Sequence, residues 1–558
     1  ECLFVLAPGS SGWGSVEEEL PFLTAALSWL NTPVADEADP NAPDKNKNYW
    51  SAFGEWYFVG YGEGCAPLEA WSAKNPIFVI AQVYLNGVSA GEAYLSKVGS
   101  QVYAVGTNGY DITEDVKSRL SARSDQMITN QDIPVPTWFV NYDAADHSLQ
   151  YWKTANDCSP SGTQNADYGT VYVQAGDSDA WQTQYAGPIS KVAVDSRQSL
   201  SGREIHDFLT CYTRYDNTSA YGNALMLRGD YTDVIVNAHK SPDRYAEQKV
   251  TMPDGAPATM ICTIVDIEGE PREILFYIPE NASELQPDGA PVITVWAGGS
   301  QTNIIFFDST CWWETANQNG IALIFTNEAY NTSVAVTPAD VDACYHAMLD
   351  LLEGWNDSGK FQFDLSRIYS TGQSMGSMES QQFAQETPDY YAAVASTSFY
   401  QDYPDAHSDK PIPTYLINGE GNGKDDTGTP YDDRWNRTDD WAQYFLRVNG
   451  FVYTPAVYAA DGTVTTFGVP VSEPVFTVTG PYDRFETYTW INGQDIPLVQ
   501  YTNSLYRPHN CLTSEIPMLW DFLEHYRCER DEDGAVTARY YSASAFKRDD
   551  QVLIQFGA

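Results

Sequence analysis

The chain has 558 residues, and its 75 acidic against 31 basic side chains give a formal net charge of −44. Such a surface repels nucleic acids, anionic membranes and polyanionic substrates, so none of these is an expected partner. No apolar stretch reaches the length of about 18 residues that a membrane span needs. The length allows roughly two to four domains. The chain begins at Glu1 rather than at a methionine, which favours a processed or trimmed product.

Nine cysteines are scattered along the chain without any C-x-x-C pair, so no zinc or redox motif is present. The sequence also lacks a Walker loop, an H-E-x-x-H helix and a Rossmann glycine string. We therefore predict no metal or nucleotide cofactor. If the protein is exported, Cys158 with Cys211 or Cys311 with Cys344 are candidate disulfides, and the connectivity stays open.

Similar short sequence segments recur in the same order in the early and late parts of the chain. Each set contains an apolar strand that runs into a glycine- and serine-containing turn, then a later strand and a last helix. The matching segments are Val83–Gly91 with Ile368–Gly376, Pro136–Asn141 with Pro413–Asn418, and Glu204–Leu209 with Leu519–Leu523. We therefore predict two tandem α/β modules, residues 1–215 and 216–530, followed by a strand-like tail over residues 531–558.

The late module has the more complete set of elements. Residues 258–278 alternate between apolar and polar side chains around a central turn, which predicts an antiparallel hairpin. Residues 292–296 and 321–325 are typical of buried strands. A helix follows, with Thr337 as its N-cap and Pro338 at its first position. Strands that alternate with helices predict a mostly parallel sheet covered on both faces.

The strongest motif of the chain is the G-x-S-x-G string of residues 372–376. The apolar strand 367–371 precedes it, and a helix over residues 377–386 is predicted to follow. A serine between two glycines at a strand-to-helix turn is the nucleophile elbow of α/β-hydrolases, in which the hydroxyl is held above the sheet. We therefore identify Ser374 as the candidate nucleophile and predict that both modules are α/β-hydrolase-like, with the early one degenerate.

A serine hydroxyl needs a general base and a third group that orients the base. In this fold the chain order is serine, acid, histidine. Of the histidines after Ser374, His407 comes before the strand that should carry the acid, and His525 falls within the predicted last helix, residues 517–526. His509 lies in the loop just ahead of that helix and is the predicted base.

The acid is expected in the loop that follows the strand Pro413–Asn418. Asp425 and Asp426 are the leading candidates, and Glu420 and the pair Asp432–Asp433 remain open alternatives.

The oxyanion hole requires backbone N–H groups aimed at the developing negative charge. Met375, directly after the nucleophile, is expected to supply one of them. The other is expected from Gly298, Gly299 and Ser300, because glycines at the end of a strand allow the main chain to approach the substrate.

The alignment of the two modules predicts no equivalent base in the early module. Ser89 lies in a G-x-S-x-G string, and Asp143 or Asp146 could serve as its acid. However, aligning Phe208 of the early last helix with Phe522 of the late one places Asp195 opposite His509, and places His206 opposite Trp520 on the helix itself. We therefore predict that Ser89 is not activated and that the early module is a pseudo-hydrolase.

The segments 296–302, 364–376 and 388–395 resemble the polyhydroxybutyrate depolymerase and feruloyl esterase group of serine esterases. The resemblance covers about residues 250–530 and implies a secreted or cell-surface esterase. That family commonly places its acid three residues after the glycine that ends the acid strand. Here this position holds Asn422, so either an insertion moves the role to Asp425 or Asp426, or the triad is weakened.

The leading hypothesis is a serine carboxylic ester hydrolase that acts through an acyl-enzyme intermediate. Feruloyl or aryl esters, acetylated sugars and hydroxyalkanoate esters are the implied substrates, either small or polymeric. The aromatic content of 14% suits clefts that stack sugar or phenolic rings. A peptidase on the same fold and a non-catalytic binding protein with two decayed modules are the alternatives.

Overall fold

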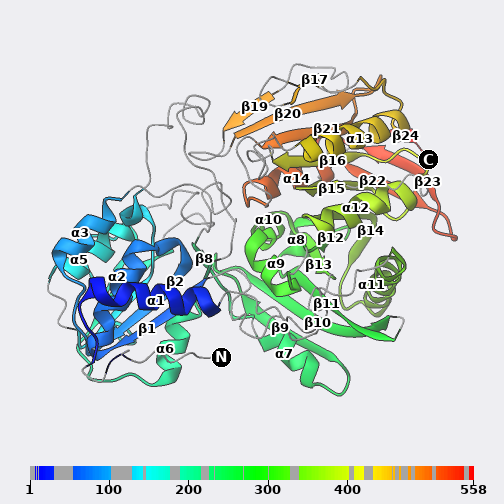
Figure 1. The fold of residues 1–558 in the computed structure, drawn as a ribbon. Helices are drawn as coiled ribbons and strands as arrows, with labels where there is room; N and C mark the ends of the chain where they lie inside the picture. Colours follow the sequence, from blue (N-terminus) through cyan, green and yellow to red (C-terminus); the bar gives the residue numbers. More distant parts are fainter. Residues whose placement is uncertain are drawn as a thin grey trace, which may run out of the picture. The chain divides into compact units, whose positions relative to one another are not determined.

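The computed structural model describes residues 7, 9, 12–30, 55–101, 129–142, 146–175, 189–214, 225–231, 233–267, 269–298, 301–326, 338–400, 402, 407–419, 432–454, 457–458, 464–466, 475–478, 484–504, 511–545 and 552–557. The chain divides into two compact units, Glu1–Arg228 (unit 1) and Gly229–Ala558 (unit 2), and each is described by itself (Figure 1).

The described strands of unit 1 form a six-stranded sheet in the order β1-β2-β3-β6-β5-β4. The first four of these strands are parallel, and the last two are antiparallel and extend one edge. Their bounds are β1 (Trp56–Tyr61), β2 (Val79–Leu85), β3 (Thr137–Val140), β4 (Thr163–Asn165), β5 (Gly169–Val173) and β6 (Lys191–Asp195). Each of the four described parallel strands lies beside the parallel strand that precedes it in the chain, so these four strands show no reversal of order.

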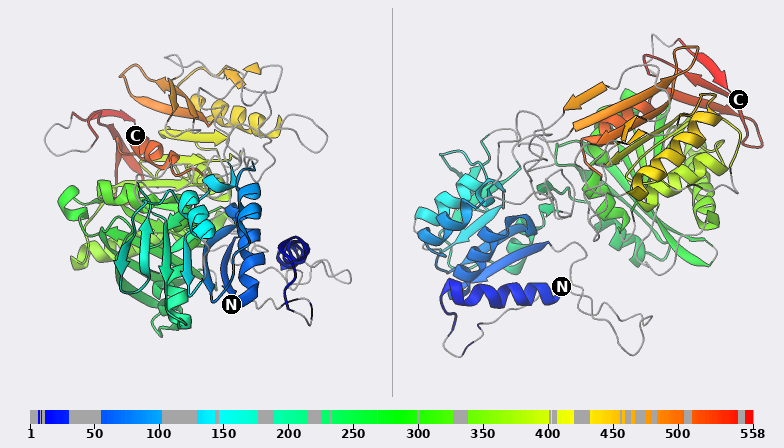
Figure 2. Two further views of the ribbon diagram at one scale, coloured as in Figure 1. Left: turned by 90° about the vertical axis from the view of Figure 1, so that its left-hand side faces the viewer. Right: turned by 45° about the horizontal axis from the view of Figure 1, so that its top comes forward.

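Helices cover both faces of this sheet, because its central strands carry apolar side chains on both sides. Tyr84 and Phe139 point into one core cluster with Trp152, whereas Val83 and Trp138 point into a second cluster with Phe208. The first cluster contains residues of α1 (Val16–Leu30), α2 (Cys65–Lys74), α3 (Glu92–Gly99) and α5 (Asp146–Ala155), and the second contains residues of α6 (Gly202–Leu209). Helix α1 packs on α2 (Figure 2). The short strands β7 (Tyr212–Arg214) and β8 (Leu225–Leu227) pair with each other.

The described strands of unit 2 form an eleven-stranded sheet in the order β19-β20-β21-β16-β15-β14-β12-β13-β11-β10-β9 (Figure 1). Their bounds are β9 (Tyr245–Thr251), β10 (Pro257–Ile267), β11 (Glu270–Pro279), β12 (Ala290–Trp296), β13 (Ala322–Phe325), β14 (Phe363–Gly372), β15 (Ala393–Thr397), β16 (Thr414–Gly419), β19 (Val475–Val478), β20 (Arg484–Ile491) and β21 (Pro497–Ser504).

The centre of this sheet is parallel, as predicted. Strands β13, β12, β14, β15, β16 and β21 run the same way, and the antiparallel hairpin of β10 and β11 confirms the one expected over residues 258–278. From β12 the chain moves outward to β13 and then crosses back to β14 on the other side of β12. The strand order therefore reverses between β12 and β14, and in open α/β sheets such a point is where ligands bind, outside the carboxyl ends of the strands.

The helices of unit 2 cover both faces of its sheet. Helix α12 packs on β12, β14 and β15, and its Phe383 and Gln381 contact Tyr345 of α11 and Trp441 of α13. Helices α10 and α14 pack against each other, α10 on β11 and β13, and α14 on β15 and β16. The helices are α7 (Asp233–Lys240), α8 (Ala282–Leu285), α9 (Asn303–Thr310), α10 (Trp312–Asn319), α11 (Pro338–Ser358), α12 (Met375–Glu386), α13 (Asp432–Val448) and α14 (Glu515–Leu523).

The tail joins unit 2 as a small sheet of its own. Strands β22 (Tyr526–Arg530), β23 (Val536–Tyr541) and β24 (Ile554–Gly557) pair antiparallel. The buried Arg539 guanidinium donates to the main-chain oxygens of Pro388, Tyr391 and Ala392, just before β15. A fully buried cation thus replaces its hydration with carbonyl dipoles, which fixes the tail to the loop between α12 and β15.

Two expectations need correction. All eight cysteines within the described parts of the chain are thiols, so neither Cys158–Cys211 nor Cys311–Cys344 is a disulfide. The Cys158 and Cys211 thiols lie 3.3 and 3.0 Å from the carbonyl oxygens of Tyr172 and Asp207, respectively. The last helix starts at Glu515 and ends at Leu523, so His525 follows it rather than lying within it. Among the described helices, none is both long and apolar enough to cross a membrane.

Candidate active site

The turn at Ser374 has the geometry that the glycine–serine motif predicts. Strand β14 ends at Gly372 and helix α12 begins at Met375, so only Gln373 and Ser374 connect them. Ser374 has φ 57° and ψ −115°, a backbone conformation that a residue with a Cβ rarely adopts. Strain of this kind costs about 1–3 kcal/mol and persists only where the surroundings impose it, most often at functional sites. The Ser374 side chain is half-buried and therefore accessible.

The two flanking glycines are required by close backbone contacts. A Cβ on Gly376 would overlap the carbonyl oxygen of Trp296 and lie 2.8 Å from that of Ala297. A Cβ on Gly372 would overlap the carbonyl group of Gly376 and lie 2.8 Å from the Trp296 oxygen. Helix α12 therefore starts directly against the end of β12. This contact places Ser374 at the point where the strand order reverses.

Main-chain hydrogen bonds fix the turn from both neighbouring strands. The N–H of Gln373 donates to Trp296 of β12 and the N–H of Ser374 donates to Thr397 of β15, each at 3.3 Å. Within the turn, the N–H of Gly376 donates to the Gln373 carbonyl at 2.9 Å. The conformation of the serine is thus imposed by the sheet rather than by its own preference.

The predicted oxyanion-hole residues are partly brought together. The Met375 N–H begins α12 and donates to no acceptor among the described residues. Gly298 lies close to Gln373, since a Cβ there would overlap the Gln373 amide oxygen. Its own N–H, however, donates to Gln301 Oε1 at 2.9 Å, an interaction that the sequence analysis missed. Gly298 N–H is therefore engaged, and the remaining candidates Gly299 and Ser300 lie outside the described residues.

The predicted base and acids also fall outside what the structure describes. This applies to His509, Asp425, Asp426 and Glu420, and to the side chains of Asp432 and Asp433, which lie at the start of α13. The strands that precede them are described. Thr397 pairs with Ile417 of β16, which pairs with Thr502 of β21, so the ends of these parallel strands lie at the same edge as Ser374.

The two other histidines that follow Ser374 have different partners. His407 Nε2 lies 2.6 Å from Asp402 Oδ1, and its ring packs on Tyr444 with centroids 4.1 Å apart. His525 Nδ1 lies 2.7 Å from the Ser542 carbonyl oxygen in the tail. These contacts do not decide which histidine is the base, and His509 stays a prediction. Among the described residues, no group of three or more His, Cys, Asp or Glu side chains is arranged to hold a metal ion.

A buried carboxyl lies on the same helix as the candidate nucleophile. Glu379 of α12 is 7% exposed, and its Oε2 has no hydrogen-bond partner among the described residues. Burial raises the pKa of this carboxyl to about 8, because the charged form loses its hydration without compensation. The folded protein therefore holds Glu379 protonated near neutral pH.

Glu379 is expected to make unit 2 less stable as the pH rises. Between the unfolded pKa of 4.5 and the folded pKa of about 8, the folded state binds the extra proton, so the free energy of unfolding falls with pH. Relative to the parent, Glu379→Gln should gain about 3 kcal/mol of stability between pH 5 and pH 8. Urea denaturation at both pH values measures this difference, with Glu386→Gln on the same helix as the control. An equal difference at the two pH values would contradict the prediction.

The early module departs from the predicted elbow. Strand β2 ends at Leu85 and α3 begins at Glu92, so Ser89 lies in a loop rather than in a tight turn. Among the described strands of unit 1, the four parallel strands also show no reversal of order like that between β12 and β14 of unit 2. Units 1 and 2 therefore share similar short sequence segments but differ in the topology of their described sheets.

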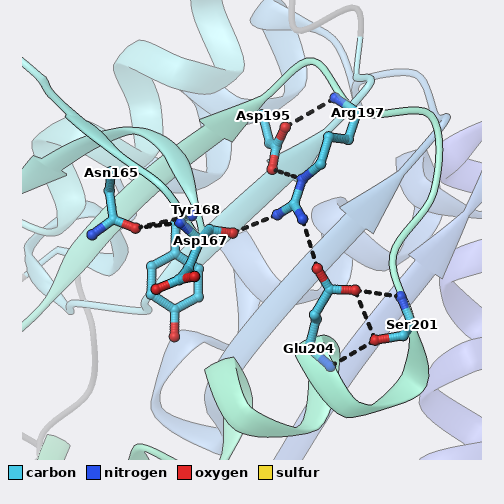
Figure 3. A network of polar contacts seen from close by, with 7 residues as sticks. All are labelled: Asn165, Asp167, Tyr168, Asp195, Arg197, Ser201 and Glu204. Carbon is cyan, nitrogen blue, oxygen red and sulfur yellow. Dashed lines mark hydrogen bonds and ion pairs between the residues drawn. The ribbon is translucent and has the colours of Figure 1, made fainter.

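Asp195, the residue aligned with His509, takes part in a structural network (Figure 3). Arg197 Nε donates to Asp195 at 2.6 Å, and its guanidinium also pairs with Glu204 at 2.6 Å. Glu204 in turn forms a capping box with Ser201 at the start of α6. The network ties the end of β6 to α6. His206 lies on α6 with an exposed ring 3.3 Å from Asp207, as predicted for a residue on the helix itself.

A histidine that the motifs of the sequence do not reveal lies beside Ser89. His147 Nε2 lies 2.7 Å from Ser89 Oγ. The histidine directly follows Asp146, which was considered only as an acid, and it comes after β3, the parallel neighbour of β2. The adjacency of these two strands was the available signal. Of the two acids proposed for Ser89, Asp143 and the side chain of Asp146 lie outside the described residues.

Comparisons with known proteins give structural similarity alone. No model of a protein family matches the chain, and no curated protein matches it. Among solved structures, the chain is similar to a thermostable esterase (15% identity, 49% of this chain and 68% of that chain, TM-score 0.29). It is also similar to an acetyl xylan esterase from Aspergillus awamori (13% identity, 47% of this chain and 94% of that chain, TM-score 0.29). A third similar structure is the S-formylglutathione hydrolase FrmB from Staphylococcus aureus (20% identity, 35% of this chain and 87% of that chain, TM-score 0.25). At TM-scores this low, the assignment of the site rests on the strand order and on the turn at Ser374.

Proposed function

We propose that unit 2 is a serine carboxylic ester hydrolase that acts through an acyl-enzyme intermediate. The observation that carries the proposal is the strained Ser374, held at positive φ between a parallel strand and a helix where the strand order reverses. A hydroxyl presented in this way is the geometry of a nucleophile elbow. Backbone strain of about 1–3 kcal/mol clusters at functional sites, so the conformation of Ser374 supports a chemical role.

The described strands support His509 as the base on grounds of reach. Strand β21 is three strands from β14, a separation of roughly 14 Å at about 4.8 Å per strand. His509 follows the end of β21 by five residues, which span up to roughly 17 Å when extended. The loop after β16, which carries Asp425 and Asp426, starts between the two. In the proposal, His509 accepts the Ser374 proton and one of these carboxylates orients the imidazole.

The reaction would proceed in two steps. Ser374 Oγ attacks the ester carbonyl and its proton passes to His509, while the Met375 N–H stabilises the negative oxygen. The C–O bond to the alcohol breaks, and His509 returns the proton to the leaving alcohol. Water then attacks the acyl-serine in the reverse sense and releases the acid.

The substrates that fit the proposal are uncharged esters, because a net charge of −44 repels polyanions. Feruloyl or aryl, acetyl-sugar and hydroxyalkanoate esters are the candidate classes. We also propose that the protein is secreted or located at the cell surface. The competing function is a peptidase, since the same triad cleaves amides.

Hydrolysis of p-nitrophenyl acetate and butyrate tests the proposal, with the matched p-nitroanilides as amide controls. We expect release of p-nitrophenol with a burst of one equivalent per chain, and a rate on esters well above that on anilides. A panel of feruloyl, acetylated-sugar and hydroxybutyrate esters then ranks the acyl groups. Cleavage of anilides at the ester rate would favour the peptidase. An absence of hydrolysis on every ester would overturn the proposal.

A further inference from the structure

Unit 1 contains a serine–histidine pair that the function proposed for unit 2 does not use. Ser89 lies in the loop between β2 and α3, and His147 lies on α5, after β3. Because β2 and β3 are parallel neighbours, their carboxyl ends meet at one edge of the sheet, and Ser89 Oγ lies 2.7 Å from His147 Nε2. Both side chains are half-buried, so solvent and small molecules can reach them.

A buried carboxyl holds the serine loop in place. Glu69 of α2 is fully buried and accepts hydrogen bonds from the Ala90 N–H at 2.7 Å and from Trp152 Nε1 at 3.0 Å. The buried Ser148 Oγ is in short contact with Ser89 Oγ. Burial raises the pKa of Glu69, and hydrogen bonds from Ala90, Ser148 and Trp152 oppose that shift. The contacts of Glu69 with Ala90 and of Ser148 with Ser89 therefore fix the position of Ser89 relative to the His147 imidazole.

We propose that Ser89 is a second nucleophile, with His147 as its base, that reacts with acyl donors carrying good leaving groups, such as aryl esters. A serine with an imidazole within hydrogen-bond reach meets the first requirement for activation. Ser89 Oγ forms a bond to the carbonyl carbon while its proton passes to His147 Nε2. The C–O bond to the aryl alcohol breaks, and the imidazolium returns the proton to that alcohol.

The restriction to good leaving groups follows from the backbone beside the serine. The Ala90 N–H, the counterpart of the Met375 N–H in unit 2, donates to Glu69 and cannot bind a developing oxyanion. A missing oxyanion donor costs about 10²–10³ in rate. Acylation of Ser89 is therefore expected to be slow, and it needs a leaving group that departs without strong stabilisation of the tetrahedral intermediate.

The test uses the full chain carrying Ser374→Ala, so that its outcome does not depend on the site in unit 2. An alkyl fluorophosphonate is the probe, since the Ser89 Oγ–P bond forms as the P–F bond breaks, fluoride leaves and His147 accepts the proton. We expect one phosphonate per chain, located on Ser89 by peptide mass spectrometry. His147→Gln keeps a hydrogen-bonding side chain but accepts no proton, and it should slow labelling by about 10²-fold or more.

Ser96→Ala, an exposed substitution on α3, is the control and should leave the labelling rate unchanged. An unrelated serine hydrolase in the same reaction confirms that the probe is competent. The proposal is overturned if Ser89 carries no label under these conditions, or if His147→Gln is labelled as fast as its parent. Because the label is mapped on the native Ser89, no result depends on whether a Ser89 variant folds.

Discussion

Ser374→Ala is expected to abolish ester hydrolysis by unit 2 while leaving that unit folded, so that only the slow reaction proposed for Ser89 remains on aryl esters. Loss of a serine nucleophile typically costs on the order of 10⁴–10⁶ in kcat, because the remaining groups stabilise the transition state without forming the acyl-enzyme. Alanine keeps the Cβ of serine, so the backbone at φ 57° is equally strained and the stability of the fold should change little. Initial rates on p-nitrophenyl butyrate, together with circular dichroism spectra, measure both expectations.

Two matched variants sharpen this test. Ser374→Gly also removes the hydroxyl, but glycine tolerates positive φ, so it should be about 1 kcal/mol more stable than Ser374→Ala and equally inactive. Ser358→Ala, at the exposed end of α11, should retain the parent rate. If the two Ser374 variants hydrolyse esters as fast as the parent, Ser374 is not the nucleophile.

The elbow of unit 2 could be predicted from the sequence because its determinants are local. Two glycines around Ser374, an apolar run before them and a helical segment after them specify the turn within a few residues. The structure shows why Gly376 is needed, because a Cβ there would collide with the carbonyl oxygens of Trp296 and Ala297 at the end of β12. That contact joins segments far apart in the chain, so the sequence alone could not reveal it.

The failed expectations in unit 1 have the opposite origin. Short apolar strands look alike, so the likeness of Val83–Gly91 to Ile368–Gly376 did not predict the different sheet topology. The pairing of Ser89 with His147 depends on β2 and β3 being neighbours, which is a property of strand order. Likewise, the spacing of cysteines does not say whether two thiols face each other. In each case the decisive quantity is a non-local distance.

Gly376→Ala is expected to destabilise unit 2 by about 3–5 kcal/mol or to prevent its folding, which is the largest stability effect we predict. The added Cβ would overlap the Trp296 carbonyl oxygen, and both partners are backbone groups that no rotamer change can move apart. Relief would require α12 to shift away from β12 and carry Ser374 out of its position. Urea denaturation followed by hydrogen exchange in peptides of β14 and α12 assigns the change to unit 2, and ester hydrolysis should be lost in parallel.

Gly354→Ala in α11 provides the matched control, because a Cβ at this exposed helical position would contact nothing within 4 Å. Alanine loses less conformational freedom than glycine in a helix, so this variant should be about 0.5–1 kcal/mol more stable than the parent. The same chemical change is thus expected to act with opposite sign at two positions of one unit. If Gly376→Ala unfolds at the urea concentration of the parent, the carbonyl of Trp296 does not lie against the start of α12. The turn would then not be held by the sheet, and the positive φ of Ser374 would lose the contact that imposes it.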